Sequence, residues 1–425
     1  MKTITLSTSE YLCIKGGNPL RGEVNVSGSK NASLPILIAS LLTEEEAVII
    51  NTPDLLDVEN TIDLLKSVGA SVAKEGNSVK VKAEFISSCK APDEAVRKMR
   101  ASVLAMGPLL ARCNKAIVSM PGGCSIGVRP VDQHLKFFES AGVEVNVKHG
   151  YIFLEKKCDK PVDFRFDVIT VTGTENALMF LSSIERRSIL RNIAIEPEVI
   201  DLANVLKKMG AEIEIEGRTA IIKGSSRLKG FTHKVIPDRI EAGTLMVGAF
   251  ATGGDVIIKD VNVDHISKII EALGEAGASI ERINENTIRV YNNSYCIKPI
   301  SVETKEYPGF PTDMQAQFMA MLSVANGTSI IKENIFENRF QHAMELKRMG
   351  ADIEIKGNTA FVRGVKELTG AEVFSTDLRA SASLVIAGLI AKGETIVRDI
   401  YHLDRGYEKL DKKLKGLGAE IERLE

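Results

Sequence analysis

A short sequence phrase recurs six times along this chain of 425 residues, and it restricts the possible folds more than any other feature. Each copy runs through mixed apolar and charged residues to a glycine and then alternates, as in VLKKMGAEI and ELKRMGADI. Successive copies are 73, 68, 67, 73 and 68 residues apart, measured between their glycines: Gly69, Gly142, Gly210, Gly277, Gly350 and Gly418. Such even spacing predicts six structural repeats of about 70 residues.

The third copy shows which elements the phrase encodes. Its apolar residues from Leu202 to Met209 follow the spacing i, i+3, i+4, i+7, which predicts an amphipathic helix. Gly210 is placed to end that helix in the left-handed conformation. The alternating residues that follow, with a turn at Glu216 and Gly217, predict a hairpin of two strands.

Every repeat also contains an earlier segment that is apolar nearly all round and rich in Ala, Ser and Gly, such as NASLPILIASLL, EAGTLMVGAFA and RASASLVIAGLIA. A segment of this kind predicts a helix buried inside a domain. Each repeat is therefore expected to run strand, buried helix, strand, amphipathic helix, strand, strand. Because solenoid repeats are shorter, roughly 20–50 residues, we expect an α/β fold of two globular domains, each built from three repeats around its buried helices.

The middle of the chain, near Lys234–Asp238, falls between repeats three and four, and we place a domain boundary there. Residues Leu12–Val26 precede the first buried helix and are expected to pair with the C-terminal repeats, so that the chain crosses between the domains twice. The expected domains are residues 30–236, which carry a loop at 121–130, and residues 1–29 together with 237–425.

Composition excludes several classes of protein. The 54 Lys and Arg against 56 Asp and Glu leave a net charge of −2, which argues against a nucleic-acid scaffold. No apolar run approaches the roughly 18 residues that span a bilayer, and the N-terminus is polar, so we expect a cytoplasmic protein. The six cysteines are spread without CxxC pairs, which predicts free thiols. The only HxxE, His342 with Glu345, has no second histidine nearby and does not predict a zinc site.

The buried helices have polar beginnings that resemble one another. Three of them show the spacing of a capping box, in which two side chains three residues apart bond to each other's backbone: Thr172 and Glu175, Thr312 and Gln315, and Asp238 and Glu241. If three repeats surround a threefold axis, these helix starts point the same way within each domain. Their N–H groups would then attract anions.

Three cations stand at or near such starts, namely Lys30, Arg100 and Arg379. Together with the helix starts they predict a cleft between the domains that binds anions. For each residue alone, an ordinary cap with a solvated charge is the alternative.

A loop rich in glycine and proline interrupts the second repeat at Pro121–Asp132. It carries Cys124 five residues before Arg129. Because nearby positive charge favours the thiolate, this pattern predicts a reactive cysteine in a loop that changes conformation. An incidental surface cysteine is the alternative.

Asp313 is expected in the first turn of the fifth buried helix, in the motif FPTDMQ. The helix dipole stabilises an anion there, so this carboxylate is a candidate base, with a plain helix cap as the alternative. Arg339 and Arg405 lead into the amphipathic helices of repeats five and six, where a surface salt bridge is the alternative reading.

At this point the motifs resemble one family, the enolpyruvyl transferases, from Leu12 to Glu425. The resemblance rests on long strings that occur in the family's order: SGSKNASLPIL, MRASVLAMGPL, PGGCSIGVRPVDQH, EPEVIDLANVL, IPDRIEAGT, FPTDMQAQF, FENRF, TDLRASASLV and HLDRGYE. It implies an inside-out α/β barrel for each domain and an active site in the cleft between them.

The resemblance implies a reaction between two small molecules. The enolpyruvyl group of phosphoenolpyruvate would move to the 3-hydroxyl of UDP-N-acetylglucosamine, with release of phosphate, through a tetrahedral intermediate and without metal or organic cofactor. This is the first committed step of peptidoglycan synthesis. The alternatives are the sister reaction on shikimate 3-phosphate, which the PGGC and RPVD strings disfavour, and a catalytically silent relative that binds the nucleotide sugar. The oligomeric state stays open.

The resemblance also assigns roles to residues. Cys124 is implied to be the general acid, able to add covalently to the substrate, and Asp313 the base near the sugar hydroxyl. The implied contacts to phosphoenolpyruvate are Lys30, Asn31, Arg129, Arg339, Asp377, Arg379 and Arg405, of which Lys30, Arg129 and Arg405 form a cationic clamp that stabilises an anionic intermediate.

A second set of residues matches the family's contacts to the nucleotide sugar. These are Asn31, Arg100, Arg129, Pro130, Val131, Asp132, Gln133, Thr170, Val171, Asp313 and Ile335. Val168 stands where many relatives carry a lysine near the nucleotide, which puts that contact in doubt. Residues 1–10 extend beyond the usual start and receive no role. The loop 121–130 is expected to close over bound substrate.

Overall fold

The computed structural model describes residues 10–91, 100–120, 131–292 and 296–425. Contacts between Cα atoms divide these residues into two compact units. Of the described residues, 28–91, 100–120 and 131–236 form the N-terminal unit, and 10–27, 237–292 and 296–425 form the C-terminal unit. The chain passes from one unit to the other at Ser27–Gly28 and again at Ile236–Pro237.

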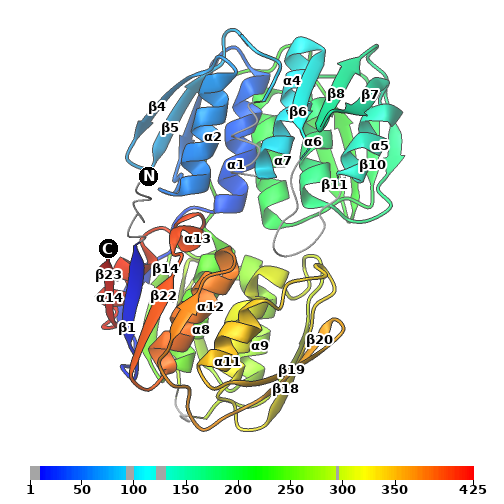
Figure 1. The fold of residues 1–425 in the computed structure, drawn as a ribbon. Coiled ribbons are helices and arrows are strands. Elements are labelled where there is room, and N and C mark those ends of the chain that lie inside the picture. Colours follow the sequence, from blue (N-terminus) through cyan, green and yellow to red (C-terminus); the bar gives the residue numbers. More distant parts are fainter. Residues whose placement is uncertain (1–9, 92–99, 121–130, 293–295) are drawn as a thin grey trace, which may run out of the picture. The chain divides into compact units, whose positions relative to one another are not determined.

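The N-terminal unit contains three sheets, each contributed mainly by one repeat (Figure 1). In spatial order their strands are β13 (Phe231–Lys234), β3 (Glu46–Ile50), β5 (Ser78–Lys82) and β4 (Ser71–Glu75); β6 (Lys115–Ser119), β8 (Tyr151–Lys156) and β7 (Val143–Lys148); and β11 (Glu212–Glu216), β12 (Thr219–Lys223), β10 (Ser188–Arg191) and β9 (Asp163–Arg165). The α-helices are α1 (Lys30–Ala39), α2 (Leu56–Ser67), α4 (Met106–Cys113), α5 (Asp132–Ser140), α6 (Val171–Leu181) and α7 (Pro197–Met209). Short 3-10 helices are η1 (Ser40–Leu42) and η2 (Arg100–Ala105).

The C-terminal unit repeats this plan. Its sheets are β15 (Ser279–Asn284), β16 (Thr287–Tyr291), β14 (Asp255–Lys259) and β2 (Arg21–Asn25); β17 (Ser301–Glu303), β18 (Thr328–Lys332), β20 (Thr359–Arg363) and β19 (Asp352–Lys356); and β21 (Glu372–Phe374), β22 (Glu394–Arg398), β1 (Tyr11–Lys15) and β23 (Glu420–Leu424). The helices are α8 (Arg239–Ala251), α9 (Ser267–Glu275), α10 (Gln315–Leu322), α11 (His342–Arg348), α12 (Leu378–Ile390), α13 (Tyr401–Asp404) and α14 (Leu410–Gly416), with 3-10 helices η3 (Val263–Ile266) and η4 (Thr312–Met314).

The predicted order of elements within a repeat is confirmed. In the third repeat, β9 leads to the buried helix α6, then β10, the amphipathic helix α7 and the hairpin β11–β12. Gly210 ends α7 at φ 114°, and its N–H bonds to the carbonyl of Leu206. The equivalent glycines of the other repeats also have positive φ, between 81° and 111°. The recurring phrase is therefore the end of a helix and the start of a hairpin.

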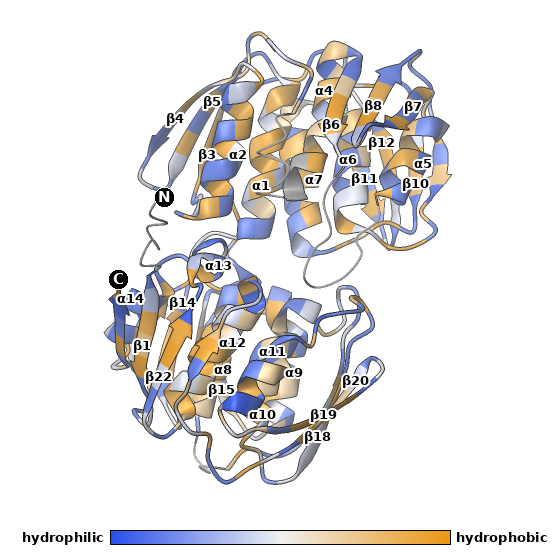
Figure 2. Ribbon diagram, viewed as in Figure 1, coloured by the Kyte–Doolittle hydropathy of each residue, from blue (hydrophilic) through white to orange (hydrophobic). Residues whose placement is uncertain are grey.

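Each unit has its own apolar core, formed around the buried helices. In the C-terminal unit α8, α10 and α12 contact one another, and every residue from Ile240 to Phe250 is buried. Figure 2 shows apolar residues along β1, β14 and β22, the strands that cover these helices. Small residues allow close packing: a Cβ atom on Gly107 of α4 would lie 2.8 Å from the carbonyl oxygen of Asn176 on α6. The α/β class and its inside-out arrangement are as expected.

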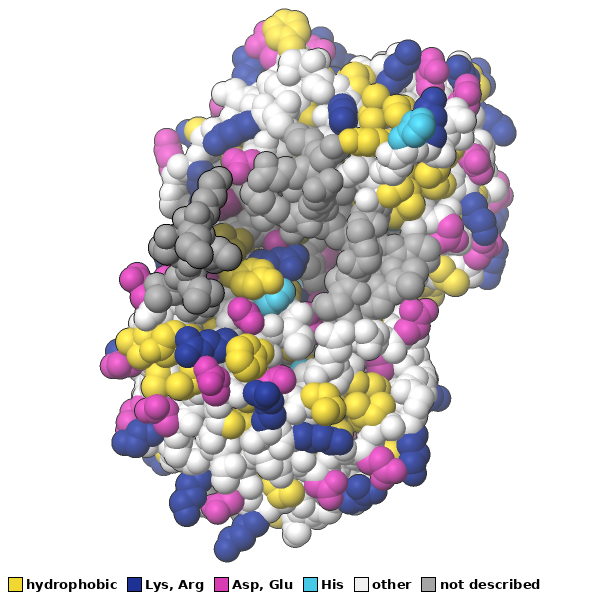
Figure 3. Space-filling view, viewed as in Figure 1, with side chains coloured by type: hydrophobic (Ala, Val, Ile, Leu, Met, Phe, Trp, Pro, Cys, Tyr) yellow, Lys and Arg dark blue, Asp and Glu magenta, His cyan; other side chains and the backbone are white. Residues whose placement is uncertain are grey.

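The first two strands pair with the second half of the chain, as predicted for Leu12–Val26. β1 lies between β22 and β23, antiparallel to both, and β2 pairs with β14 in parallel. None of the helices in the described part of the chain is long and apolar enough to cross a membrane. Figure 3 shows basic and acidic side chains intermixed over the face that it presents.

Two of the three predicted capping boxes are wrong. α6 begins two residues earlier than predicted, so that Thr170, and not Thr172, caps it by accepting from the N–H of Gly173 at 3.2 Å. Thr312 caps no helix, because its hydroxyl donates to the carboxylate of Glu333 at 2.8 Å. In both places a tertiary contact or an upstream residue overrides the local spacing.

The third predicted box is half right. Asp238 caps α8, accepting from the N–H groups of Ile240 and Glu241 at 2.9 Å each. The carboxylate of Glu241 does not return the bond, because it accepts from the N–H of Ser27 at 2.7 Å and is paired with Lys413.

Candidate active site

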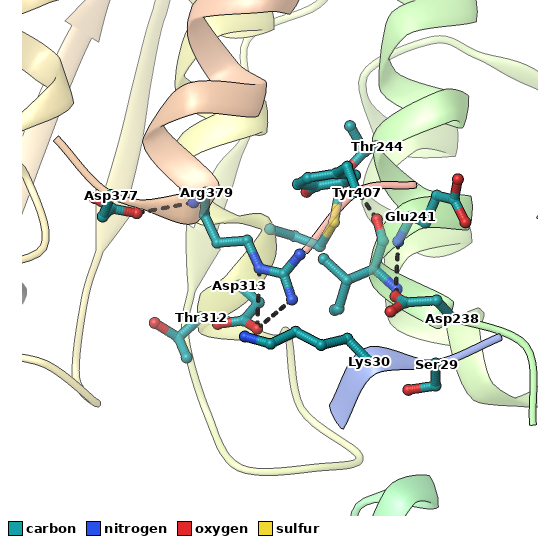
Figure 4. Close-up of polar contacts among 12 residues, drawn as sticks. Ser29, Lys30, Asp238, Glu241, Thr244, Thr312, Asp313, Asp377, Arg379 and Tyr407 are labelled. Carbon is teal, nitrogen blue, oxygen red and sulfur yellow. Dashed lines mark hydrogen bonds and ion pairs between the residues drawn. The ribbon is translucent and has the colours of Figure 1, made fainter. Parts of the chain in front are cut away.

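The C-terminal unit holds a buried cluster of charge around Asp313, which lies in η4 immediately before α10. Arg339 donates from Nη2 to one carboxylate oxygen at 2.7 Å, and Arg379 donates to the other from Nη2 at 2.9 Å and from Nε at 3.2 Å. Figure 4 shows Arg379 pointing from the start of α12 toward this carboxylate. The Arg379 side chain is 2% exposed and that of Asp313 is 25% exposed. The three residues form one ion-paired group.

The two arginines decide the charge of Asp313. Burial alone would raise the pKa of its carboxyl, but the charges of Arg379 and then Arg339 outweigh burial and hold this pKa well below its ordinary value. The carboxylate is therefore a firmly held anion and, while both guanidinium groups bind it, a weak base. A role as base requires that an incoming anion draws at least one arginine away.

Arg379 is positioned by its helix and by an aromatic ring. Asp377 caps α12 and accepts from the N–H of Arg379 at 2.8 Å. The guanidinium carbon lies 5.3 Å from the centre of the Tyr407 ring, within the range of a cation–π contact. The Tyr407 hydroxyl is 2.9 Å from that of Thr244, and Gln317 donates to both at 3.1 Å. Sequence reasoning missed this group of hydrogen-bonded side chains around Arg379, because its members come from three helices and a loop.

Arg339 is positioned by a hydroxyl and by an aromatic ring. Its Nη1 donates to the hydroxyl of Thr312 at 2.8 Å, and its guanidinium lies 5.1 Å from the ring of Phe336. The hydroxyl of Thr312 in turn donates to the buried carboxylate of Glu333. Two of the four arginines that the resemblance places near phosphoenolpyruvate, Arg339 and Arg379, are thus bound to Asp313 in this structure.

A second buried ion pair lies at the start of α8. Glu241 pairs with Lys413, whose Nζ also donates to the Ser27 hydroxyl at 2.7 Å. Burial raises the pKa of Glu241 to about 7 despite the attraction of Lys413. Ser27 is the last residue of the C-terminal unit before the chain leaves it, so this pair fixes that point of the backbone.

In the N-terminal unit, Lys30 stands at the first position of α1, after the capping residue Ser29. Its Nζ lies 2.8 Å from the carboxylate of Asp57, with 11% and 2% of the two side chains exposed. Asp57 was not singled out from the sequence, where it is only one acid in the first turn of an amphipathic helix. Asn31 follows in α1 and is partly buried.

Val131 directly precedes α5, Asp132 and Gln133 are its first two residues, and the Gln133 side chain makes three hydrogen bonds. Its amide nitrogen donates to Asp132 at 3.0 Å and to Asp167 at 3.1 Å, and its oxygen accepts from the N–H of Asp167 at 2.9 Å. This fixes the start of α5 to the segment that leads into α6. Next along that segment, Val168 is 60% exposed.

A network of hydrogen bonds among uncharged groups, centred on Asn176, also contacts α5. The amide of Asn176 accepts from the N–H of Gly107 at 2.9 Å and donates to the carbonyl of Val103 at 2.9 Å, which sets its orientation. Its nitrogen is also 2.9 Å from Nδ1 of His134, so that this ring nitrogen accepts and the proton sits on Nε2, facing Thr172 at 3.1 Å. His134 is therefore a neutral structural residue.

The remaining predicted residues fall at element ends or outside the described part. Thr170 caps α6, Val171 is its first residue, Ile335 follows β18, and Arg405 ends α13. Arg100 begins η2, and the placement of its side chain is not described. Cys124, Arg129 and Pro130 lie outside the described residues. Within the described ranges no group of three or more His, Cys, Asp or Glu side chains could hold a metal ion.

An α/β fold built from these repeats is shared with solved enolpyruvyl transferases. The family model described as EPSP synthase (3-phosphoshikimate 1-carboxyvinyltransferase) matches residues 14–414. The chain belongs to this family.

Curated relatives are similar over the whole length. The UDP-N-acetylglucosamine 1-carboxyvinyltransferase of Geotalea uraniireducens (strain Rf4) is 51% identical over 417 residues, covering 98% of this chain and 100% of that protein. The protein of the same name from Geotalea daltonii is 48% identical with the same coverage.

Solved structures share the fold at lower identity. The enolpyruvyl transferase NikO from Streptomyces tendae has a TM-score of 0.88 at 23% identity, covering 98% of this chain and 99% of that one. An EPSP synthase from Acinetobacter baumannii has a TM-score of 0.77 at 18% identity, covering 98% of this chain and 100% of its own.

Proposed function

We propose that this protein transfers the enolpyruvyl group of phosphoenolpyruvate to the 3-hydroxyl of UDP-N-acetylglucosamine, with release of phosphate, as an early cytoplasmic step of peptidoglycan synthesis. The observation that carries the proposal is the 51% identity, over both chains nearly end to end, to a protein named for this activity. The family model carries the name of the shikimate enzyme, but identity near 50% to the nucleotide-sugar enzymes favours the first acceptor.

The chemistry is an addition followed by an elimination. A proton added to the methylene carbon of phosphoenolpyruvate makes the neighbouring carbon electrophilic, and the sugar oxygen bonds to that carbon as its own proton leaves. In the second half, a proton leaves the new methyl group, the double bond re-forms, and phosphate departs. We assign the first proton donor to Cys124 and the base to Asp313.

The arginines around Asp313 support this assignment in a specific way. Phosphoenolpyruvate carries a carboxylate and a phosphate, which compete with Asp313 for Arg339 and Arg379. Once a guanidinium turns to the substrate, the pKa of Asp313 rises and the carboxylate becomes able to take the hydroxyl proton. Substrate binding thereby activates the base.

Further cations are proposed to stabilise the anionic intermediate, because charges that are already in place need no reorganisation during the reaction. We assign Lys30, Arg129 and Arg405 to this clamp, with Asn31 and Asp377 nearby. The nucleotide sugar is assigned to Arg100, residues 129–133, Thr170, Val171 and Ile335. These roles stay predictions, as does the expectation that residues of both units contribute to one active site.

The direct test is phosphate release from phosphoenolpyruvate with each of two acceptors. We expect release with UDP-N-acetylglucosamine and none with shikimate 3-phosphate. The reverse result would assign the chain to the sister reaction. Release with neither, together with measurable binding of the nucleotide sugar, would identify a catalytically silent relative.

Cys124→Ser is expected to keep the fold and to lower turnover by about 10²–10⁴-fold, the usual contribution of a general acid. Steady-state kinetics over a range of pH measures this, and circular dichroism checks the fold. Fosfomycin should inactivate the wild type by modifying Cys124, seen as a mass increase on the peptide that contains it. Normal turnover by the serine variant at every pH would remove Cys124 from the mechanism.

Asp313→Ala should bind UDP-N-acetylglucosamine in calorimetry yet form product about 10²–10⁴-fold more slowly. Asp313→Asn is the matched variant, since it keeps the shape of the side chain and removes only its charge and basicity. Full activity in either variant would refute the role as base.

A further inference from the structure

Glu333 is a buried acid to which the proposed reaction assigns no role. It follows β18 directly and is 2% exposed. Its Oε1 accepts from the hydroxyl of Thr304 at 2.9 Å and from the backbone N–H groups of Ile335 and Phe336 at 2.8 and 3.2 Å. Its Oε2 accepts from the hydroxyl of Thr312 at 2.8 Å. One carboxylate thus joins three separate segments of the chain.

The connection continues to the charged cluster. Thr312 can donate its single hydroxyl proton to Glu333 because its oxygen accepts from Arg339, at 2.8 Å. Arg339 then binds Asp313 at 2.7 Å. A continuous chain of hydrogen bonds therefore runs from the backbone at Ile335 to the carboxylate of Asp313.

Four of the other repeats differ from this arrangement. After the equivalent strand they carry an Asn or Asp with positive φ, namely Asn51, Asn192, Asp260 and Asp399. In three of them the next residue donates its N–H to the hairpin opposite: Thr52 to Asn77 at 2.8 Å, Ile193 to Arg218 at 3.2 Å, and Val261 to Asn286 at 3.1 Å. In repeat five the N–H of Glu333 makes this same bond, to Asn358 at 2.8 Å, with no residue in between, as does Met120 in repeat two, to Gly150 at 2.7 Å.

Glu333 is equivalent to Thr52, Ile193 and Val261, which are at most 1% exposed, and to Met120 of repeat two, which is 41% exposed. Only repeat five holds an acid at this position. A buried carboxylate is costly unless its oxygens are bonded, and here four donors satisfy it. A buried, fully bonded acid at a position that is uncharged in the other repeats marks a functional feature.

We propose that Glu333 is a positioning residue for the transfer reaction, which holds the acceptor-contact segment at Ile335 in register with the turn that bears Asp313 and its partner Arg339. This rests on the proposed function for the roles of Ile335 and Asp313. The carboxylate is needed because it accepts on both oxygens. A glutamine accepts on one alone, so that Glu333→Gln keeps the three donors of Oε1 and breaks only the bond from Thr312.

The test compares graded variants. Glu333→Gln should lower kcat by about tenfold and move the acidic limb of the pH profile upward, because a loosened Arg339 lets the pKa of Asp313 rise, while KM for the nucleotide sugar changes less than about twofold. Thr312→Val should copy this result, Thr312→Ser should not, and the double variant Glu333→Gln with Thr312→Val should be no worse than either alone.

Glu333→Ala also removes the hydrogen bonds that Glu333 accepts from the N–H groups of Ile335 and Phe336. It should also raise KM for the nucleotide sugar by about tenfold and accelerate amide hydrogen exchange at Ile335 and Phe336. The control is Glu303→Gln, at an exposed neighbouring acid that bonds to Asn334 at 2.8 Å and does not touch Thr312; it should leave kcat and KM within about twofold.

Two results would overturn the proposal: wild-type kcat and pH profile in Glu333→Gln, or unchanged exchange at Ile335 and Phe336 in Glu333→Ala. Hydrogen exchange needs no turnover. If the wild type fails to use the nucleotide sugar but exchange responds as expected, the proposed function is wrong and the link through Glu333 still holds.

Discussion

Asp313, which is partly buried, and Glu175, which is 2% exposed, are acids near the starts of corresponding helices, one in each unit, and their pKa values shift in opposite directions. Burial raises the pKa in both. At Asp313 the charges of Arg379 and Arg339 reverse the effect of burial, whereas at Glu175 the negative charges of Glu198 and Glu196 add to it, so that the pKa lies well above its ordinary value. The neighbours of a buried carboxyl, and not burial itself, set its charge.

The same contrast extends to the surroundings. The polar centre around Asp313 contains two buried guanidinium groups, whereas the network around Asn176 and His134 consists of neutral groups. A preorganised set of charges stabilises anions that form during a reaction, and a neutral network fixes shape. The charges around Asp313 thus match the proposed role in anion chemistry, and the network around Asn176 holds helices in place.

The largest effect is expected from Arg379→Ala. It leaves Asp313 with one partner in a buried site, which should lower the free energy of unfolding by about 3–5 kcal/mol. Arg363→Ala is the matched control, because Arg363 also pairs with two acids but is 47% exposed, and its loss should be much smaller because solvent screens exposed pairs. Urea unfolding of both variants measures the difference. Equal losses would mean that the Asp313 cluster carries no special stability.

A smaller loss is expected from Asn176→Ala in the neutral network. It leaves the N–H of Gly107, the carbonyl of Val103 and Nδ1 of His134 without their bonds, and should cost about 2 kcal/mol. Asn146→Ala, which removes one surface bond to Glu144, is the control. Because no charge is involved, the loss should not depend on salt. A strong salt dependence would contradict the contrast between the two regions.

Near pH 5 the smallest effect is expected from Glu175→Gln, and this effect grows with pH. Since the pKa of Glu175 is higher in the folded than in the unfolded chain, the folded state binds the extra proton. Stability of the wild type should therefore fall as pH rises above about 4.5, by up to about 1.4 kcal/mol per pH unit until the folded pKa is passed. Glutamine lacks this slope, so its advantage should grow with pH in unfolding curves. A difference that does not change with pH would place Glu175 in the ionised state.

Much of the fold was readable from the sequence, because repetition made the signal redundant. The helix-ending glycines, the uniformly apolar segments and the pairing of the first strands were all predicted correctly. The capping boxes at Thr172 and Thr312 were not, since a three-residue spacing carries no information about an earlier cap or a distant Glu333. A local sequence pattern therefore predicts a helix end correctly where contacts within the same segment determine it.

The site was harder to predict for the same reason. Asp313 and both arginines were singled out, but their mutual pairing joins residues 26 and 66 positions apart, and Asp57 gave no distinctive signal as the partner of Lys30. Glu333, in contrast, could have been found from the sequence. Repeat five reads IIKEN where four of the others carry an Asn or Asp after the strand, and aligning the repeats against one another would have shown an acid at a position that is uncharged in the rest.

The central claim is that the carboxyls of Asp313 and Glu175 have pKa values shifted in opposite directions. Infrared difference spectra recorded over a range of pH test it directly, because a protonated carboxyl absorbs apart from a carboxylate. We predict that Glu175→Gln removes a protonated carboxyl that persists above the ordinary pKa of glutamate, and that Asp313→Asn removes only carboxylate absorption at and above the ordinary pKa of aspartate. Glu241 is unchanged in both variants and cancels in the comparison. Loss of the protonated band in Asp313→Asn, or its retention in Glu175→Gln, would contradict the account.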